Sequence, residues 1–178
     1  ETWAAMIEPQ AGGIAITAIT STRNALYLGF VLGLVARTPT FDVAGIQVLD
    51  TQAQFGSLLW TKIEAIEGMT ARDDVLWVGT VAPTATGAGL FKSEDGGDSF
   101  VAVRGDISVF DLAVNPLDDG HLLVSTVNGP VFESLDGGDT WTDVSQGVLG
   151  WDSLAVAQNR DDPEHLLFSS LAGLVDNG

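Results

Sequence analysis

The octapeptides SEDGGDSF at residues 93–100 and SLDGGDTW at residues 134–141 share the pattern Ser-x-Asp-x-Gly-x-Ser/Thr-aromatic. The second copy begins 41 residues after the first, and no other segment recurs so specifically. Internal repeats of about 40 to 50 residues are typical of propeller blades and solenoid turns. The pair therefore indicates an all-β repeat protein.

Each octapeptide has the residues of a tight hairpin turn. Asp-Gly-Gly supplies the positive φ angles of a short turn, and the aspartate carboxylate can accept hydrogen bonds from backbone amides across it. The final aromatic residue begins the outgoing strand and can pack back under the turn. We therefore assign a structural role to the positions that the two copies share, with the carboxylates bracing the turns: Ser93, Asp95, Gly97, Phe100, Ser134, Asp136, Gly138 and Trp141.

These octapeptides resemble the Asp-box (BNR) repeat of sialidases, sortilin-type receptor ectodomains and photosystem II stability/assembly-factor-like propellers. In that family the box joins the third and fourth strands of a propeller blade. The resemblance implies a β-propeller of four-stranded antiparallel blades, with about four blades in this chain, either complete or as part of a larger propeller.

Short apolar strings recur outside the boxes and follow polar turns, as expected for one blade per repeat. They lie at residues 25–30, 75–80, 121–126 and 165–170. The sequence therefore predicts a single domain over residues 1–178, with approximate blades at 14–62, 63–105, 106–147, and 148–178 plus 1–7. Residues 58–69 are compatible either with a short helix or with a strand that starts near Ile63.

The two ends of the chain depart from the repeat. Residues 38–57 contain no box, and the last unit stops before one. Thr2-Trp3 resembles Thr140-Trp141 at the end of a box, so residues 2–7 are expected to supply the outer strand of the last blade, which would remove two sheet edges. The alternative is a piece of a longer propeller cut between blades, and both interpretations stay open.

The composition narrows the functional class. A formal net charge of −17 at pH 7 opposes binding to nucleic-acid phosphates and favours cations or a basic partner. The positive mean hydropathy of so acidic a chain favours a subunit of a larger assembly. The longest apolar run, residues 25–36, is too short for a membrane-spanning helix. The absence of cysteine excludes disulfides and thiol catalysis.

Candidate catalytic and metal-binding residues have simpler structural interpretations. The resemblance raises the possibility of a sialidase-like glycosidase, but the single tyrosine, Tyr27, lies in an apolar strand and is better explained as a core residue. Arg37 could be the remnant of an arginine triad, although an arginine at a sheet edge is the commoner explanation. His121 and His165 share one repeat position rather than a metal-ligand spacing. Acidic turns that could hold calcium match no twelve-residue calcium loop and are better explained by solvation: Asp118, Asp119, Asp161, Asp162 and Glu164. We therefore predict no catalytic, cofactor-binding or metal-binding residues, and no cofactor.

The leading functional hypothesis is a non-catalytic scaffold or assembly-factor-like propeller. It would dock on other proteins, as part of a larger membrane-associated complex, through loops at residues 38–57 and 81–89. The resemblance implies an extracytoplasmic location in the periplasm, a lumen or outside the cell. The alternatives are a carbohydrate-binding or receptor-ectodomain module, for which exposed Trp60 and Trp151 would stack on sugars, and a partial sialidase-like glycosidase.

Overall fold

The computed structural model describes most of the chain from residue 15 to residue 176. The described residues are 15–39, 45–49, 51, 54–55, 61–69, 72–82, 88–115, 118–127, 129–145, 153–159, 162, 166–170 and 173–176. The predicted pairing of residues 2–7 with the last blade lies outside them, as do Trp60, Trp151 and His165.

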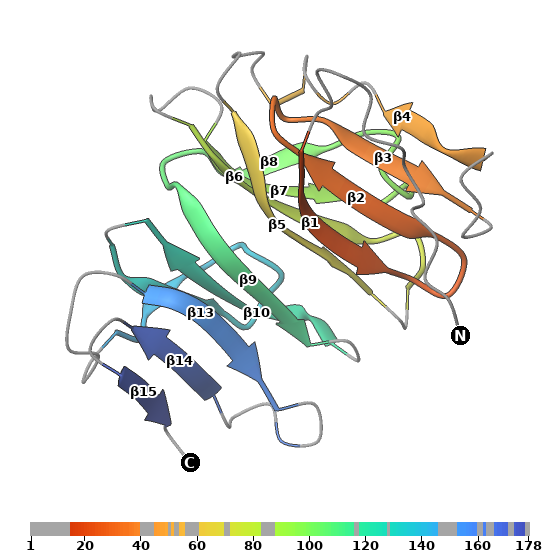
Figure 1. Cartoon of the computed structure of the whole chain (residues 1–178). Helices are drawn as coiled ribbons and strands as arrows, with labels where there is room; N and C mark the ends of the chain where they lie inside the picture. Colours follow the sequence, from red (N-terminus) through yellow and green to blue (C-terminus); the bar gives the residue numbers. More distant parts are fainter. Residues whose placement is uncertain are drawn as a thin grey trace, which may run out of the picture.

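The described residues form four antiparallel sheets that follow one another along the chain (Figure 1). Within each sheet, the order of the strands in space is their order in the sequence. Sheet 1 contains β1 (Ile16–Ser21), β2 (Leu26–Phe30), β3 (Val35–Thr38) and β4 (Gln47–Leu49), and sheet 2 contains β5 (Lys62–Gly68), β6 (Leu76–Val81), β7 (Gly89–Ser93) and β8 (Val101–Arg104). Sheet 3 contains β9 (Val109–Asn115), β10 (Asp118–Thr126), β11 (Val131–Ser134) and β12 (Thr142–Asp143), and sheet 4 contains β13 (Ser153–Gln158), β14 (Leu166–Ser170) and β15 (Gly173–Asp176).

This architecture confirms the prediction of an all-β fold built from four-stranded antiparallel sheets. The four recurrent apolar strings form the second strand of each sheet, namely β2, β6, β10 and β14. The ambiguous stretch around Ile63 is a strand, β5, which pairs with β6 through a register shift between Ile63 and Ala65. Both faces of β5 are buried, because Ile63 and Ile66 join one core cluster and Ala65 joins the next, as expected for a strand between two sheets.

Sheet 1 has a fourth strand although its sequence has no octapeptide turn. β4 pairs with β3 from Val35↔Leu49 to Arg37↔Gln47. Thr51 supports this pairing from beyond the strand, because its hydroxyl accepts from the amide of Val35 at 3.2 Å and donates to the carbonyl of Gly33 at 2.7 Å. A side-chain bridge thus holds the β3–β4 pair at the end opposite the connection between these two strands.

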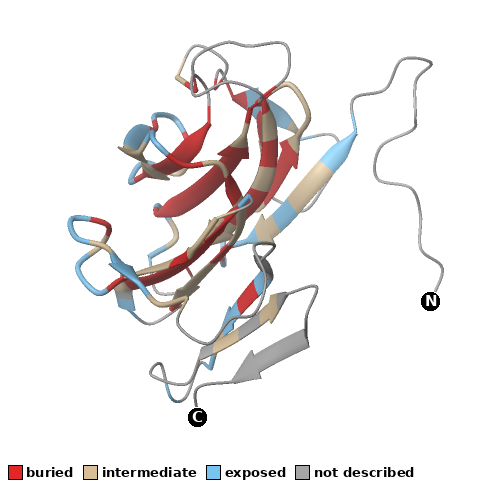
Figure 2. Cartoon of the chain, turned by 90° about the vertical axis from the view of Figure 1, so that its left-hand side faces the viewer, coloured by how far each residue is buried: buried red, intermediate tan, exposed pale blue. Residues whose placement is uncertain are grey.

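The core lies between consecutive sheets (Figure 2). Tyr27 and Val35 of sheet 1 pack against Ile66 and Val78 of sheet 2 in one buried cluster. Trp77 and Leu90 on the other face of sheet 2 join Leu112 and Leu122 of sheet 3 in a second cluster. A third, smaller cluster joins Leu123 and Val131 of sheet 3 to Val156 of sheet 4. Each sheet between two others is therefore apolar on both faces.

Glycines on the second strands set the spacing between sheets. A Cβ on Gly29 would lie 2.9 Å from Cβ of Ile63 on β5, and a Cβ on Gly79 would lie 2.8 Å from Cβ of Val109 on β9. Such separations are shorter than carbon atoms tolerate, so only a residue without a side chain permits this approach. Gly29 and Gly79, at equivalent positions of two repeats, thus both allow the next sheet to pack closely.

We predict that Gly79→Ala lowers the free energy of unfolding by about 1–3 kcal/mol, because the new methyl group overpacks the junction between β6 and β9. Urea denaturation of the purified chain measures the change. The matched control is Gly105→Ala, since no atom lies within 4 Å of its ideal Cβ. Equal losses in the two variants would show that the close approach does not limit the packing.

Candidate functional site

The first octapeptide forms a turn between β7 and β8 that its own side chains satisfy. Asp95 accepts three hydrogen bonds, from the Ser93 hydroxyl at 2.8 Å, the Ser99 amide at 2.8 Å and the Ser99 hydroxyl at 2.5 Å. The Ser93 oxygen in turn accepts from the amide of Gly97 at 2.8 Å. Both oxygens of the carboxylate are therefore engaged in holding the turn.

The second octapeptide, between β11 and β12, repeats this geometry. Asp136 accepts from the Ser134 hydroxyl at 2.9 Å, the Thr140 amide at 2.8 Å and the Thr140 hydroxyl at 2.5 Å. Gly137 and Gly138 have φ angles of 74° and 95°, which match 70° and 94° at the corresponding glycines of the first turn. These backbone angles require glycine, and the predicted turn residues of each octapeptide come together as one unit.

The aromatic residues that end the octapeptides differ in burial. Phe100 is buried, and its ring meets that of Phe55 with centroids 5.1 Å apart in an edge contact. Trp141 is half-buried, donates from Nε1 to the carbonyl of Gly138 at 2.9 Å and lies beneath the guanidinium of Arg104. Both rings therefore pack beside their turns.

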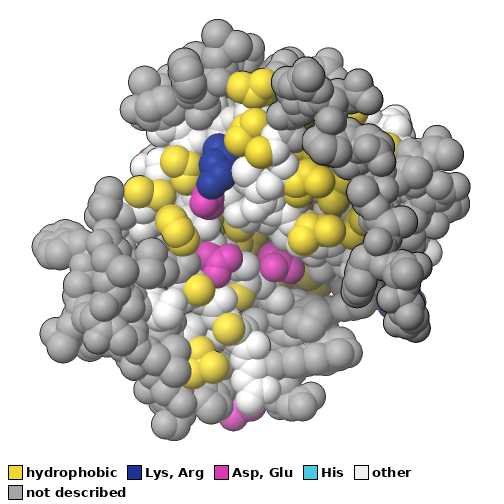
Figure 3. Space-filling model, viewed as in Figure 1, with side chains coloured by type: hydrophobic (Ala, Val, Ile, Leu, Met, Phe, Trp, Pro, Cys, Tyr) yellow, Lys and Arg dark blue, Asp and Glu magenta, His cyan; other side chains and the backbone are white. Residues whose placement is uncertain are grey.

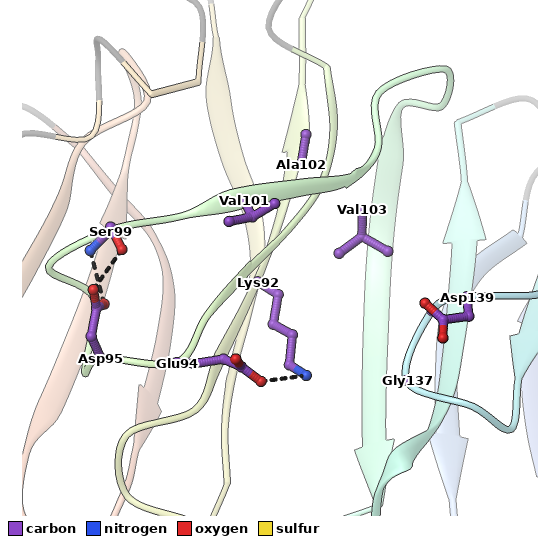
Figure 4. Close-up of a pocket in the computed structure, with 10 residues that line it drawn as sticks. Lys92, Glu94, Asp95, Ser99, Val101, Ala102, Val103, Gly137 and Asp139 are labelled. Atoms are coloured by element: carbon purple, nitrogen blue, oxygen red, sulfur yellow. Dashed lines mark hydrogen bonds and ion pairs between the residues drawn. The ribbon is translucent and has the colours of Figure 1, made fainter.

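A pocket of about 670 Å³ separates the two octapeptide turns (Figure 4). Val101 and Val103 of β8 line it together with Lys92 of β7. The first turn contributes Glu94, Asp95 and Ser99, and the second contributes Gly137, Gly138 and Asp139. The pocket therefore has an apolar strand on one side and mainly acidic residues at its rim.

Tyr27 and Arg37, the residues considered for a sialidase-like site, contact the first turn instead. Tyr27 is buried and donates its hydroxyl to the carbonyl of Gly96 at 3.2 Å. Burial raises the pKa of Tyr27 above its ordinary value, an effect that the neighbouring Arg37 opposes. Arg37 donates to the same carbonyl at 2.8 Å and pairs with Asp98 at 3.0 Å. The two side chains fasten sheet 1 to the turn of sheet 2.

His121 joins sheets 3 and 4. It is buried, with Nε2 2.9 Å from the carboxylate of Glu133 and Nδ1 2.7 Å from the side-chain amide nitrogen of Gln158. Asp118, one of the acids considered for calcium, accepts from the amide of Gly120 at 3.0 Å. In the part of the chain that the structure describes, no group of three or more histidine or acidic side chains is arranged to hold a metal ion.

The sequence reasoning missed an acidic pair on β5 and β9. Figure 3 shows acidic side chains at the centre of the face that these strands form. Burial, with a smaller contribution from the charge of Asp111, raises the pKa of Glu67 to about 7. Burial also raises the pKa of Asp111, although the amide of Val156 donates to its carboxylate at 2.9 Å. No sequence signal marks the pair, because the strands that carry it meet only through packing of the sheets.

The comparisons with known proteins support the fold. No family model and no curated protein matches the sequence. The solved structures that resemble it include an ancestral GH74 enzyme, with a TM-score of 0.68 and 18% identity over 99% of this chain and 24% of that chain. A second is the β-propeller domain of Cps50 (Swd1) from Myceliophteria thermophila, with a TM-score of 0.63 and 13% identity over 91% of this chain and 52% of that chain.

A third similar structure is the extracellular domain of a putative one-component system from B. thetaiotaomicron, with a TM-score of 0.63 and 16% identity over 89% of this chain and 21% of that chain. The chain thus spans about a fifth to a half of the length of these structures. At such low identities the likeness establishes the β-propeller fold alone. The described residues include no helix long and apolar enough to cross a membrane.

We predict that Asp136→Asn destabilises the chain above about pH 4 and has a shrinking effect below it. Hydrogen bonds from the Thr140 hydroxyl and amide hold the pKa of Asp136 below its usual 3.8. Because the folded pKa is depressed, the stabilisation is complete above the unfolded pKa and is lost as the pH falls through the folded one. Urea midpoints from about pH 6 to about pH 2.5 measure this effect. The control is Asp139→Asn in the same turn. If Asp136→Asn lowered the urea midpoint by the same amount at every pH, the prediction would be contradicted.

We predict the opposite pH dependence for Glu67→Gln. Between the usual pKa of 4.5 and the folded value of about 7, the folded chain retains a proton that the unfolded chain releases, so wild-type stability falls as the pH rises. The variant cannot ionise and should gain on the wild type, by up to about 3 kcal/mol above pH 7. Thermal unfolding of the wild type and the variant at about pH 5 and pH 8 tests this prediction. The control is Glu64→Gln on the same strand, since the carboxylate of Glu64 pairs with Lys62. A difference that does not grow with pH would show that Glu67 is not protonated in the fold.

Proposed function

We propose that this chain is a non-catalytic protein-interaction propeller, a scaffold or assembly-factor-like module that docks on a larger, membrane-associated protein complex. The observation that carries the proposal is the apolar surface on the outer strands. Val48 on β4 is 62% exposed and Val101 on β8 is 69% exposed, and both strands lie at the edge of their sheets. Edge strands with exposed apolar side chains are common sites for the addition of a strand from a partner.

The charge and the use of the carboxylates support the same function. A net charge of −17 favours encounter with a basic partner surface. The two octapeptide aspartates are engaged in their turns, and the buried Tyr27 is bonded to a carbonyl rather than presented in a pocket. We therefore propose that the chain is not an enzyme.

We further propose an extracytoplasmic location. The supporting observations are the extracellular domain among the similar structures and the resemblance of both octapeptides to the Asp-box repeat, whose propellers are mostly exported. The proposed docking loops are residues 81–89, which connect β6 to β7, and residues 38–57, which include the edge strand β4. Many of these residues lie outside the described ones.

Native mass spectrometry of the protein isolated from its own cells tests the proposal. We expect a stoichiometric complex with another protein, and we expect Val101→Lys to reduce the complex by about tenfold, since a charge replaces an apolar contact at the edge of sheet 2. The matched control is Ile19→Lys, at a residue 63% exposed on the first strand of sheet 1. A clean monomer that binds glycans on an array would favour the carbohydrate-binding alternative, and hydrolysis of a fluorogenic sialoside would favour the glycosidase.

A further inference from the structure

The junctions between sheets 1 and 2 and between sheets 2 and 3 are built from equivalent residues. Arg37 lies opposite Tyr27 in the pairing of β2 with β3, and Lys92 lies opposite Trp77 in the pairing of β6 with β7. Arg37 and Lys92 therefore occupy one repeat position. The octapeptide turns supply the other half of each junction: Gly96 and Asp98 in the first turn correspond to Gly137 and Asp139 in the second.

In the first junction the arginine fills the space between sheet and turn. One nitrogen of Arg37 donates to the carbonyl of Gly96 at 2.8 Å, and the other pairs with Asp98 at 3.0 Å. Gln47 of β4 orients that second nitrogen at 2.9 Å. This arrangement uses the planar fork of a guanidinium, which can serve a carbonyl and a carboxylate at the same time.

In the second junction the corresponding lysine does not make these contacts. Lys92 pairs with Glu94 at 2.9 Å and lies over the ring of Trp77. Figure 4 shows Lys92 directed toward Glu94, with Asp139 on the opposite side of the pocket. Arg104, the next cation along sheet 2, pairs with Asp106 at 2.8 Å and covers the ring of Phe132.

Asp139 consequently has no cationic partner among the described residues. Its carboxylate and the backbone of Gly137 instead line the pocket of about 670 Å³. The acceptors that hold a guanidinium in the first junction are thus present in the second, beside an open space. Val101 and Val103 supply an apolar wall along which an aliphatic stem can lie.

We propose that this pocket accepts an arginine side chain from an extended segment of a partner protein. The guanidinium takes the place that Arg37 has in the first junction, donating to the Gly137 carbonyl and pairing with Asp139. The segment runs beside β8, whose exposed Val101 adjoins the pocket. The inference rests on the proposed interaction function and specifies its chemistry: the partner is basic, which agrees with the net charge of −17.

Short peptides test the pocket directly. The probes are an acetylated and amidated tripeptide with a central arginine between two valines and its citrulline counterpart, which keeps the shape and loses the charge. Binding is followed by calorimetry and by NMR shifts of the amides of residues 92–103 and 137–139. We expect the citrulline peptide to bind at least about tenfold more weakly, because charge-assisted hydrogen bonds are the stronger ones. Equal binding of both peptides, or no binding of the arginine peptide at about 10 mM, overturns the proposal.

Three variants locate the contact. Asp139→Asn should weaken the arginine peptide by about tenfold, whereas Asp98→Asn, the equivalent change in the occupied junction, should leave its affinity unchanged. In Lys92→Arg the new arginine should occupy the pocket itself, because at that position it can bind Gly137 and Asp139 as Arg37 binds Gly96 and Asp98. We expect it to reduce peptide binding about tenfold and to raise the urea midpoint. The assignment would be contradicted if Asp98→Asn weakened peptide binding and Asp139→Asn did not, or if Lys92→Arg bound the peptide as tightly as the wild type.

These outcomes separate the inference from the function on which it rests. A complex that survives Asp139→Asn in native mass spectrometry, together with no peptide binding, would overturn the arginine pocket and leave the interaction function standing. Selective peptide binding by a protein that is monomeric in its own cells would overturn the interaction function.

Discussion

The aspartate-braced glycine turn is the constraint on which the outer half of sheets 2 and 3 depends. Two successive glycines with positive φ reverse the chain, and the carboxylates of Asp95 and Asp136 hold the reversal from inside. The turn does more than connect two strands. Its outward carbonyl is an acceptor for the sheet before it, as the contacts of Tyr27 and Arg37 with Gly96 show. The same eight residues thus fix both the outer strand and the junction with the neighbouring sheet.

The junctions also depend on glycine residues in the second strands, which have no side chain. Gly29 and Gly79 let the first strand of the next sheet approach closely, and the apolar residues beside them fill the space on either side. Because this packing is made of repeated positions, a substitution at one repeat position has a natural comparison at another. Lys92 in sheet 2, at the repeat position that Arg37 has in sheet 1, is such a difference, and a pocket lies beside it.

Much of the fold follows from local chemistry, which explains why it could be predicted from the sequence. The residues of each turn interact with residues only a few positions away, and each apolar string is continuous, so both patterns can be recognised in the sequence. β4 was not predictable in this way, because its support comes from Thr51, which bonds Val35 and Gly33 across the sheet. The role of Arg37 was equally hidden, since its partners lie about sixty residues away in the next sheet.

The acidic pair on β5 and β9 belongs to the same class of long-range feature, and it bears on how the charge of the molecule should be interpreted. Several described acidic side chains, such as Asp74, Glu94 and Asp98, are exposed in turns. Glu67 differs, because burial and the nearby charge of Asp111 raise its pKa to about 7. Net charge alone does not distinguish these two environments. The distinction matters for partner binding, because a carboxylate whose pKa is raised by burial, such as that of Glu67, attracts a cation only after it loses its proton.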